Sequence, residues 1–367
     1  EISLGLVGSE MCIRDSINTS NGLTISVDVP SGLDPLTGQI HDVAVKPQYT
    51  VSFHKVKTGI HKAGEEKVGG IVTCDIGIPI EAEYFINYGD MIKLNKRSLK
   101  SHKGNNGKVL IVGGSKEYSG APSIAGLAAI GAGADLVYVA APESAALAIS
   151  THPDLIVNSL KGDYLTTEHA GEILEIAEKV DAVLLGPGAG INNETGKLLN
   201  ILASKIKKPL VLDADALKQV KPQIIKNRDD VILTPHIFEF KSFFGKDIKL
   251  DLDSYDFAEV DENISEFQQV VRQINGAVVV KGAIDLVIQK NKFKLNKSGN
   301  PGMTVGGTGD ALAGIATSLL SKGLNAFDAA TLAIFINGLA GDEAYLEKGY
   351  GFGATDVVAH IGKVIKG

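Results

Sequence analysis

The chain has 367 residues, 44% of them hydrophobic and 22% charged, which is typical of a globular protein with one large domain or two medium ones. Its formal net charge of -7 opposes binding to nucleic acid or to an anionic membrane, because the overall field repels both. The two cysteines, Cys12 and Cys74, lack the spacing of a disulfide framework or a zinc site, so we expect a cytoplasmic protein without nucleic-acid or membrane partners.

The N-terminal part predicts strands and a leader. Residues 3–16 read SLGLVGSEMCIRDS, resemble translated sequencing adapter more than protein, and lead us to treat residues 1–16 as a leader without function. The apolar run from Leu23 to Val29 predicts a buried strand, and the Pro- and Gly-rich stretch after it predicts a turn. Further strands follow, and no helical pattern occurs before about residue 80. This region therefore reads as an α/β unit without its covering helices.

A change of pattern marks a domain boundary. Residues 88–107 are polar with an excess of Lys and Arg, so they predict a linker and a boundary near residue 95. Beyond it, short apolar runs such as KVLIVGG, DAVLLGPG and AVVVKG alternate with helical patterns. Strands that are apolar on both faces indicate a mostly parallel sheet with helices on both faces. Ligands of such sheets bind beyond the carboxyl ends of the strands.

Glycine, aspartate, histidine and lysine recur where these apolar runs end. The positions are Gly113, Gly114, Ser115, Gly186, Pro187, Gly188, Asp213, Asp215, Thr234, Pro235, His236, Lys281 and Gly282. Each has a structural explanation on its own: a tight turn, a helix cap, a turn histidine or a lysine that extends to water. These alternatives stay open for every one of the residues taken singly.

The stretch GMTVGGTGDALAG, residues 302–314, predicts a helix that begins near Thr308 or Gly309. The unpaired N–H groups and partial positive charge of a helix N-terminus suit a transferring phosphoryl group, and Asp310 is placed to accept a proton from a hydroxyl. The alternative is that Asp310 only complements the helix dipole, which does not require so many glycines. Neither a Walker loop nor a Rossmann dinucleotide fingerprint occurs.

Taken in order, these motifs resemble a known family. SHKGNNGKVLIVGGS, LLGPGAG, LDADAL, LTPHIFEF, VVVKG and GNPGM followed by GTGD are similar to the ADP/ATP-dependent NAD(P)H-hydrate dehydratases, which have a ribokinase-like fold. The resemblance covers residues 95–367. Upstream, SVDVPSGLD and VKPQYTVSFHKVKTGIHKAG resemble the end of the Rossmann-like NAD(P)H-hydrate epimerase domain, so residues 17–90 are expected to be its remnant.

The resemblance implies a metabolite repair reaction with Mg²⁺ and with ADP or ATP as phosphoryl donor, carried out by a cytoplasmic homo-oligomer. NADHX or NADPHX would be dehydrated to NADH or NADPH with release of phosphate, and Asp310 would be the base. Substrate contacts are implied for Ala121, Gly186, Gly188, His236 and Asp310. Nucleotide contacts are implied for Lys281, Gly282, Ala283, Ile284, Asp285 and Gly309, and an anion hole for Gly306, Gly307, Thr308 and Gly309. No protein metal ligand is assigned in this domain.

Departures from the family pattern affect three places. Asp285 stands where the family has a threonine in K-G-x-x-T, and Ile237 and Phe238 replace Pro-Gly in TPHPGE. In the epimerase remnant, Asp28 matches a substrate contact and Ser31 a potassium contact, but the first half of that domain is absent. We therefore expect no epimerase activity, and an exposed apolar sheet edge.

Two other functions remain open. A small-molecule hydroxyl kinase of the ribokinase-like fold would also have a G-x-G-D helix, whereas GNPGM and TPHxxE favour the dehydratase. A non-catalytic nucleotide-binding protein is the second alternative, and the presence of Asp310, His236 and Lys281 opposes it.

Overall fold

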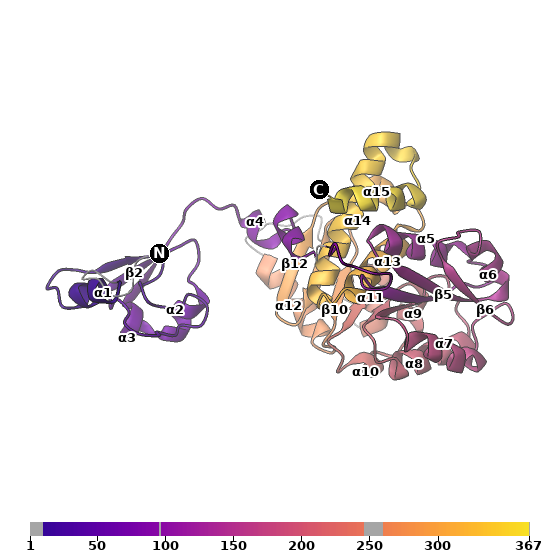
Figure 1. Ribbon diagram of the computed structural model, residues 1–367, viewed down its shortest axis with the longest axis horizontal. Coiled ribbons are helices and arrows are strands. Elements are labelled where there is room, and N and C mark those ends of the chain that lie inside the picture. The colour runs from indigo at the N-terminus through magenta and orange to yellow at the C-terminus, as the bar shows by residue number, and fades with distance from the viewer. Residues whose placement is uncertain (1–9, 95–96, 246–259, 367) are drawn as a thin grey trace. The chain divides into compact units, whose positions relative to one another are not determined.

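The computed structural model describes residues 10–94, 97–245 and 260–366. They form two compact units that divide between Ala82 and Glu83 (Figure 1). The division corrects the boundary that we expected near residue 95. Ile86 N donates to Leu295 O at 2.8 Å, so the segment after the division is tied by its backbone to the second unit. Composition alone could not reveal this pairing.

The first unit contains a parallel sheet in the order β1-β2-β3. Its strands are β1 (Ile25–Val27), β2 (Tyr49–Phe53) and β3 (Gly70–Cys74). Its helices are α1 (Glu10–Asn18), α2 (Thr58–Ala63), α3 (Glu65–Val68) and α4 (Ile80–Tyr84), the last of which crosses the division. These helices correct the expectation of no helix before about residue 80. Helices as short as α2 and α3 cannot show a full apolar period in the sequence.

Strand β1 is shorter and less buried than the sequence predicted. Only Ser26 is buried, whereas its neighbours Ile25 and Val27 are 51% and 65% exposed. Among the described residues β1 pairs with β2 alone. Apolar side chains therefore lie along an open edge of the sheet, as the resemblance to part of an epimerase domain predicts.

Helix α1 overlaps the segment that we treated as a leader. It begins at Glu10, and Arg14 Nη2 donates to Glu10 Oε2 at 2.6 Å across one helical turn. Arg14 Nε also donates to Ser31 Oγ at 3.0 Å. Residues 10–16 thus have local structure, while residues 1–9 lie outside the described part of the chain. The assignment of residues 1–16 to a leader stays a prediction.

Within the described part of the second unit, nine strands form one sheet in the order β12-β11-β10-β9-β8-β7-β4-β5-β6. The bounds are β4 (Lys108–Val112), β5 (Leu136–Pro142), β6 (Ile156–Leu160), β7 (Ala182–Leu185), β8 (Leu210–Leu212), β9 (Val231–Leu233), β10 (Ala277–Val280), β11 (Asp285–Gln289) and β12 (Lys292–Asn296). All neighbours are parallel except at β11 and β12, which are antiparallel. The predicted, mostly parallel sheet is confirmed.

Helices cover both faces of this sheet. They are α5 (Gly120–Gly131), α6 (Glu143–Ile149), α7 (Ala170–Ala177), α8 (Asn193–Lys205), α9 (Asp215–Gln219), α10 (Pro222–Ile225), α11 (Ile237–Phe244), α12 (Val260–Val271), α13 (Thr308–Ser321), α14 (Ala326–Lys348) and α15 (Ala354–Lys366). Short 3₁₀ helices span Tyr88–Lys93, Thr167–His169, Pro301–Thr304 and Gly349–Gly351. None of the described helices combines the length and apolar character that a membrane span requires.

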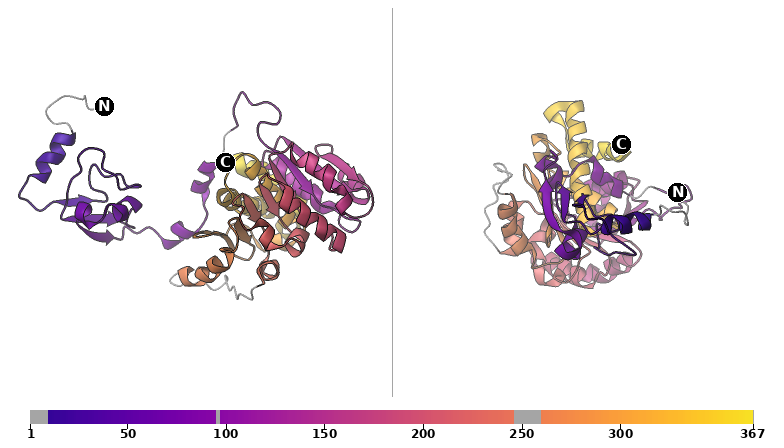
Figure 2. Two further views of the ribbon diagram at one scale, coloured as in Figure 1. Left: turned by 90° about the horizontal axis from the view of Figure 1, so that it is seen from below. Right: turned by 90° about the vertical axis from the view of Figure 1, so that its left-hand side faces the viewer.

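The sheet separates two apolar cores. Val109 and Ile111 of β4 pack into the core that also contains α5, α13, α14 and α15. Leu110 and Val112 of the same strand pack into the opposite core, with α7, α8 and α11 (Figures 1 and 2). Val109, Leu110, Ile111 and Val112 are thus buried whichever way they point, which explains the continuous apolar run in the sequence of this strand.

The strand order reverses at β4. This strand pairs with β5 on one side and with β7 on the other, both in parallel register. In open α/β sheets such a reversal leaves a crevice beyond the carboxyl ends of the strands, where ligands bind. The glycines after β4 and β7 flank this crevice.

Candidate active site

The turn after β7 is built for close backbone approach. Gly186 has a φ of +119°, and a Cβ built there would lie 2.0 Å from Asp213 O. Gly114 N donates to Pro187 O at 2.8 Å, which ties the turn to the segment after β4. A side chain at position 186 would therefore separate β7 from β8. The glycine at 186 is required by packing, in addition to any contact with a ligand.

Gly188 and Ala121 lie together at the N-terminus of α5. A Cβ built at Gly188 would lie 3.2 Å from Ala121 Cβ and 2.8 Å from Tyr118 O. The φ of Gly188 is +59°, in the left-handed region. The structure thus brings together two of the predicted substrate contacts, which are far apart in the sequence.

Strands β8, β9 and β10 each contribute one polar residue at their carboxyl ends. Thr234 Oγ1 donates to Asp213 Oδ1 at 2.7 Å, and Lys281 Nζ lies 3.5 Å from the same oxygen. Asp213 is 2% exposed, so its charge is desolvated and its partners matter. These contacts hold the lysine in a defined position rather than leaving it to extend freely into water.

Helix α13 begins at Thr308, as the sequence predicted. Gly307 precedes it with a φ of +98°. Thr308 Oγ1 donates to Met303 O at 2.7 Å and fixes the glycine-rich turn against the helix. A Cβ built at Gly309 would lie 3.3 Å from Lys281 Nζ, so the ammonium group lies beside the first turn. A cation and a helix N-terminus meet here, which is a setting for an anion.

Asp310 is half-buried in this first turn. Burial and the negative charge of Asp213 raise the pKa of Asp310 to about 7, although the positive charge of Lys281 opposes the rise. A carboxylate with a pKa near neutrality is suited to accept a proton from a hydroxyl and to release it again. The charge pattern around Asp310 therefore agrees with the role of a general base.

His236 caps helix α11. Its Nδ1 accepts hydrogen bonds from Phe238 N at 3.1 Å and from Glu239 N at 3.2 Å. These bonds require an unprotonated Nδ1, and Nε2 lies 3.4 Å from Glu239 Oε1. Burial lowers the pKa of His236, with the charge of Glu239 acting in the opposite sense. The residues that replace the Pro-Gly of the family pattern form the first turn of α11, and Phe238 is 74% exposed.

A cavity of about 430 Å³ lies beside the first turn of α13. Its lining includes five predicted nucleotide contacts, namely Lys281, Gly282, Ala283, Asp285 and Gly309. The sixth, Ile284, is not among the lining residues and packs against an apolar core. The structure adds lining residues that the sequence analysis did not assign as contacts, namely Ser298, Asn300, Leu312, Ile334 and Asn337. Asn300 and Leu312 lie within the motif stretches GNPGM and GMTVGGTGDALAG, whereas the sequence context of the other three is ordinary.

The loop that carries GNPGM is fixed to α14. Asn300 Nδ2 donates to Asp342 Oδ1 at 3.0 Å, and Gly299 N donates to Asp342 Oδ2 at 2.9 Å. Asn300 Oδ1 in turn accepts from Gly302 N at 3.0 Å. One wall of the cavity is therefore held by a bidentate carboxylate. Asp342 is a supporting residue that the motif itself did not reveal.

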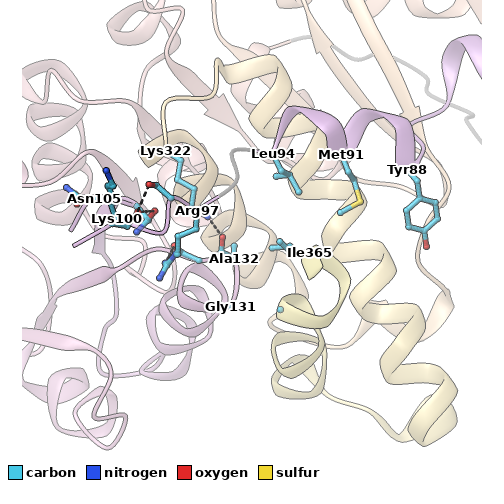
Figure 3. Close-up of a pocket in the computed structure, with 15 residues that line it drawn as sticks. Tyr88, Met91, Leu94, Arg97, Lys100, Asn105, Gly131, Ala132, Lys322 and Ile365 are labelled. Atoms are coloured by element: carbon cyan, nitrogen blue, oxygen red, sulfur yellow. Dashed lines mark hydrogen bonds between the residues drawn. The ribbon is translucent and has the colours of Figure 1, made fainter. Parts of the chain in front are cut away.

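A second cavity, of about 940 Å³, is lined by residues of the 3₁₀ helix Tyr88–Lys93, of α5 and of α15 (Figure 3). Two cationic side chains of its lining bind backbone carbonyl oxygens just after α5. Arg97 Nη2 donates to Gly133 O at 3.1 Å, and Lys322 Nζ donates to Ala132 O. Arg97 also pairs with Asp135 at 2.8 Å. None of the predicted site residues lines this cavity.

Comparison with known proteins decides the family. A family model described as NAD(P)H-hydrate dehydratase matches residues 109–363. The chain belongs to the NAD(P)H-hydrate dehydratase family. A second model, described as YjeF-related protein N-terminus, matches residues 6–59, so the first unit carries a short fragment of that domain.

The relatives agree with this assignment. The bifunctional NAD(P)H-hydrate repair enzyme Nnr of Methanothermobacter thermautotrophicus is 48% identical over 353 residues, which are 95% of this chain and 67% of the relative. The chain thus spans about two thirds of that relative's length.

Two solved structures confirm the ribokinase-like fold. A ribokinase-like superfamily protein from Enterococcus faecalis has a TM-score of 0.67 at 21% identity, and the match covers 77% of this chain and 95% of that one. The ADP/ATP-dependent NAD(P)H-hydrate dehydratase from Bacillus subtilis, co-crystallised with ATP and Mg²⁺, has a TM-score of 0.61 at 22% identity, with 79% and 99% covered.

The dehydratase from Bacillus subtilis was co-crystallised with ATP and Mg²⁺, which directs attention to the carboxylates of this site. Among the described residues, no group of three or more His, Cys, Asp or Glu side chains is placed to hold a metal by itself. Mg²⁺ commonly binds one or two carboxylates together with phosphate oxygens and water. The negative charge of Asp213 acts on Asp310, and these two carboxylates would hold such an ion together with the phosphate oxygens of a nucleotide.

The epimerase-like fragment has its own polar cluster. Asp28 has a φ of +64°, accepts a hydrogen bond from Phe53 N at 3.0 Å and pairs with Lys57. The hydrogen bond from Lys57 lowers the pKa of Asp28. Asp28 and Lys57 line a cavity of about 670 Å³, whereas Ser31 is not among its lining residues. The two predicted epimerase residues are therefore not brought into one cavity.

Proposed function

We propose that this chain is a hydro-lyase that uses ADP or ATP to dehydrate NADHX or NADPHX, a metabolite repair reaction in the cytoplasm. The observation that carries the proposal is the position of Asp310. It lies in the first turn of α13, within the electrostatic reach of Lys281, and it directly follows Gly309, which lines the cavity together with residues of the nucleotide-binding motif. A base and an anion site are thus adjacent, which phosphoryl transfer to a hydroxyl requires.

In the first step, Asp310 accepts the proton of the hydroxyl on the hydrated nicotinamide ring. The hydroxyl oxygen then bonds to the terminal phosphorus of the nucleotide, and the bond from that phosphorus to its bridging oxygen breaks. AMP leaves when the donor is ADP, and ADP leaves when it is ATP. The N–H groups of Gly306, Gly307, Thr308 and Gly309, together with Lys281, stabilise the negative charge on the transferring group. Mg²⁺, when bound, would neutralise further phosphate charge.

In the second step, the ring carbon–oxygen bond breaks and phosphate departs. The neighbouring ring carbon loses a proton, and the double bond of NADH or NADPH is restored. Phosphorylation converts a poor leaving group into a good one, so the nucleotide supplies the driving force. Ala121, Gly186, Gly188 and His236 would hold the dinucleotide beyond the ends of the strands. We propose a homo-oligomer, as in the family resemblance, and no epimerase activity from the first unit by itself.

The test supplies hydrated NADH with Mg²⁺ and either nucleotide, and follows the absorbance of reduced nicotinamide. Nucleotide-dependent recovery of NADH is expected, with loss in Asp310→Asn and retention in Asp154→Asn, which changes an exposed carboxylate in the loop after α6. A stable phosphorylated product without NADH would favour a kinase of the same fold. Nucleotide binding without any turnover would favour a non-catalytic role.

A further inference from the structure

The lining of the cavity beside α13 contains both positively and negatively charged groups. Lys281 and the N-terminus of α13 provide positive charge, whereas Asp285, the first residue of β11, provides a carboxylate. A phosphate chain would be attracted by the first group and repelled by the second. The two groups can serve one ligand if they contact different parts of it.

Asp285 is held rigidly where it lines this cavity. Its Oδ1 accepts from Gly282 N at 3.0 Å, and its Oδ2 accepts from Asn296 Nδ2 at 2.9 Å. A carboxylate has about four acceptor sites, so these two donors leave capacity for further hydrogen bonds. Asp285 is 9% exposed and lines the cavity, so a further donor can reach it from there.

The support behind Asp285 fixes its orientation. Asn296 lies directly opposite Asp285 in the antiparallel pairing of β11 and β12. Asn296 Oδ1 accepts from Ser298 Oγ at 2.8 Å, and Ser298 Oγ lies 3.2 Å from Phe335 O of α14. Because Asn296 Oδ1 receives a hydroxyl donor, its Nδ2 is the atom that faces the carboxylate. The Asp285 carboxylate thus accepts a hydrogen bond from Asn296 Nδ2, whose position is itself fixed by hydrogen bonding.

Nucleotides offer one obvious donor that a carboxylate can bind at a distance from the phosphates, namely the ribose hydroxyls. Carboxylates bind ribose hydroxyls in dinucleotide-binding folds for the same reason. We propose that Asp285 accepts hydrogen bonds from the ribose hydroxyls of the nucleotide and so selects ribonucleotides over 2′-deoxyribonucleotides. This inference rests on the proposed function, in which the cavity holds ADP or ATP. The apolar lining residues Leu312 and Ile334 are left to contact the base.

The first measurement needs only the unaltered chain. Calorimetric titration compares ADP, 2′-deoxy-ADP, 3′-deoxy-ADP and inosine diphosphate, which lacks the amino group of adenine. ADP is expected to bind at least about tenfold tighter than one or both deoxy analogues, since a hydrogen bond to a charged group is lost. Inosine diphosphate is expected to bind with an affinity close to that of ADP.

Two substitutions separate ribose recognition from support of the cavity. Asp285→Asn is expected to weaken ADP about tenfold while leaving the deoxy analogue nearly unchanged, so that the preference for ribose disappears. Lys281→Met is the matched control, because it removes a phosphate contact and should weaken ADP and deoxy-ADP by the same factor. Circular dichroism on both variants checks that the fold is retained.

Several outcomes would overturn the inference. Equal affinity of the unaltered chain for ADP and for both deoxy analogues would overturn it, and this result does not depend on whether Asp285→Asn folds. If Asp285→Asn lowers the affinities for ADP and deoxy-ADP by the same factor, Asp285 has a purely structural role. If the unaltered chain binds inosine diphosphate weakly, the site recognises the base instead of the ribose. Absence of a ribose preference in the unaltered chain, with NADH recovery intact, rejects this inference alone. Absence of any ADP binding rejects the proposed function as well.

Discussion

Lys281 and Asp213 form an ion pair in which Nζ lies 3.5 Å from Oδ1, although the strands that precede them, β10 and β8, are separated by β9. Thr234, which follows β9, completes the contact by donating to the same Asp213 oxygen. Three adjacent strand ends thus converge on one buried carboxylate. Asp213 acts on the site in two ways, because it positions Lys281 and its charge raises the pKa of Asp310.

Replacing Asp213 with Asn should therefore alter both nucleotide binding and pH dependence. Removal of the negative charge lowers the pKa of Asp310, so the acid limb of the kcat/KM profile for NADH recovery should move to lower pH. Nucleotide affinity should also fall, since Lys281 loses its partner. Thr234→Val is the comparison variant, because it removes the hydrogen bond but keeps the charge. An unchanged acid limb in Asp213→Asn would contradict this electrostatic link.

Asp310 should make the protein less stable at neutral pH than at acid pH. Its pKa is about 7 in the folded chain against 3.8 for the free group, so ionisation is disfavoured by folding. The free energy of unfolding should fall as the pH rises between these values, since the folded state binds more protons there. Asp310→Asn lacks this loss and should be more stable than the unaltered chain at pH 8, by at most about 4 kcal/mol.

Urea unfolding at several pH values measures this effect. The gain from Asp310→Asn should nearly vanish near pH 4, where the carboxyl group is protonated in the folded chain and only about half ionised in the unfolded chain. Asp154→Asn, which changes an exposed carboxylate, serves as the control variant. A gain that is the same at pH 4 and pH 8 would mean that the charge on Asp310 is not the cause.

The sequence was sufficient to predict the elements whose determinants are local. The apolar runs of β4 and β7, the start of α13 at Thr308 and the cap of α8 all depend on neighbouring residues. The Asn192 side chain, for example, accepts from Thr195 N at 2.9 Å, a cap that needs only two residues three positions apart. A strand that is buried on both faces can likewise be seen in the sequence, because it forms a continuous apolar run.

Features that depend on strand register could not be predicted in the same way. Asp285 appears in the sequence only as a departure from K-G-x-x-T, and its partner Asn296 becomes visible through the pairing of β11 with β12. A shift of one residue would place Asn296 on the other face of the sheet. The role of Asp342 similarly depends on the docking of a distant helix against the GNPGM loop.

Gly186 should tolerate no side chain. In Gly186→Ala the new Cβ would lie 2.0 Å from Asp213 O at a φ of +119°, so both a backbone clash and dihedral strain oppose folding. We expect a loss of about 3 kcal/mol or more in the free energy of unfolding, or failure to fold. Gly171→Ala in α7 is the matched control, since nothing lies within 4 Å of its Cβ position. This control should stabilise the chain by up to about 1 kcal/mol.

His236 should contribute to stability and to substrate binding through different atoms. Its Nδ1 caps α11, so His236→Ala should cost about 1 kcal/mol of stability and raise the KM for the hydrated dinucleotide. Asn is a good helix cap but lacks the imidazole ring, so His236→Asn should raise KM with little loss of stability. The comparison separates the two roles, because a structural residue alone would leave KM unchanged in the Asn variant.

The pH dependence of these variants provides an independent check on the cap. Because the pKa of His236 is lowered by burial, its neutral form is favoured in the folded chain. Its contribution to stability should be complete above the ordinary histidine pKa of about 6.5 and lost as the pH falls through the lower folded value. Protonation of Nδ1 removes the acceptor for Phe238 N and Glu239 N, so α11 should fray in acid. His236→Asn lacks this titration. The melting temperature of the unaltered chain should therefore fall more between pH 8 and pH 5 than that of His236→Asn. Parallel curves would show that Nδ1 does not cap the helix in solution.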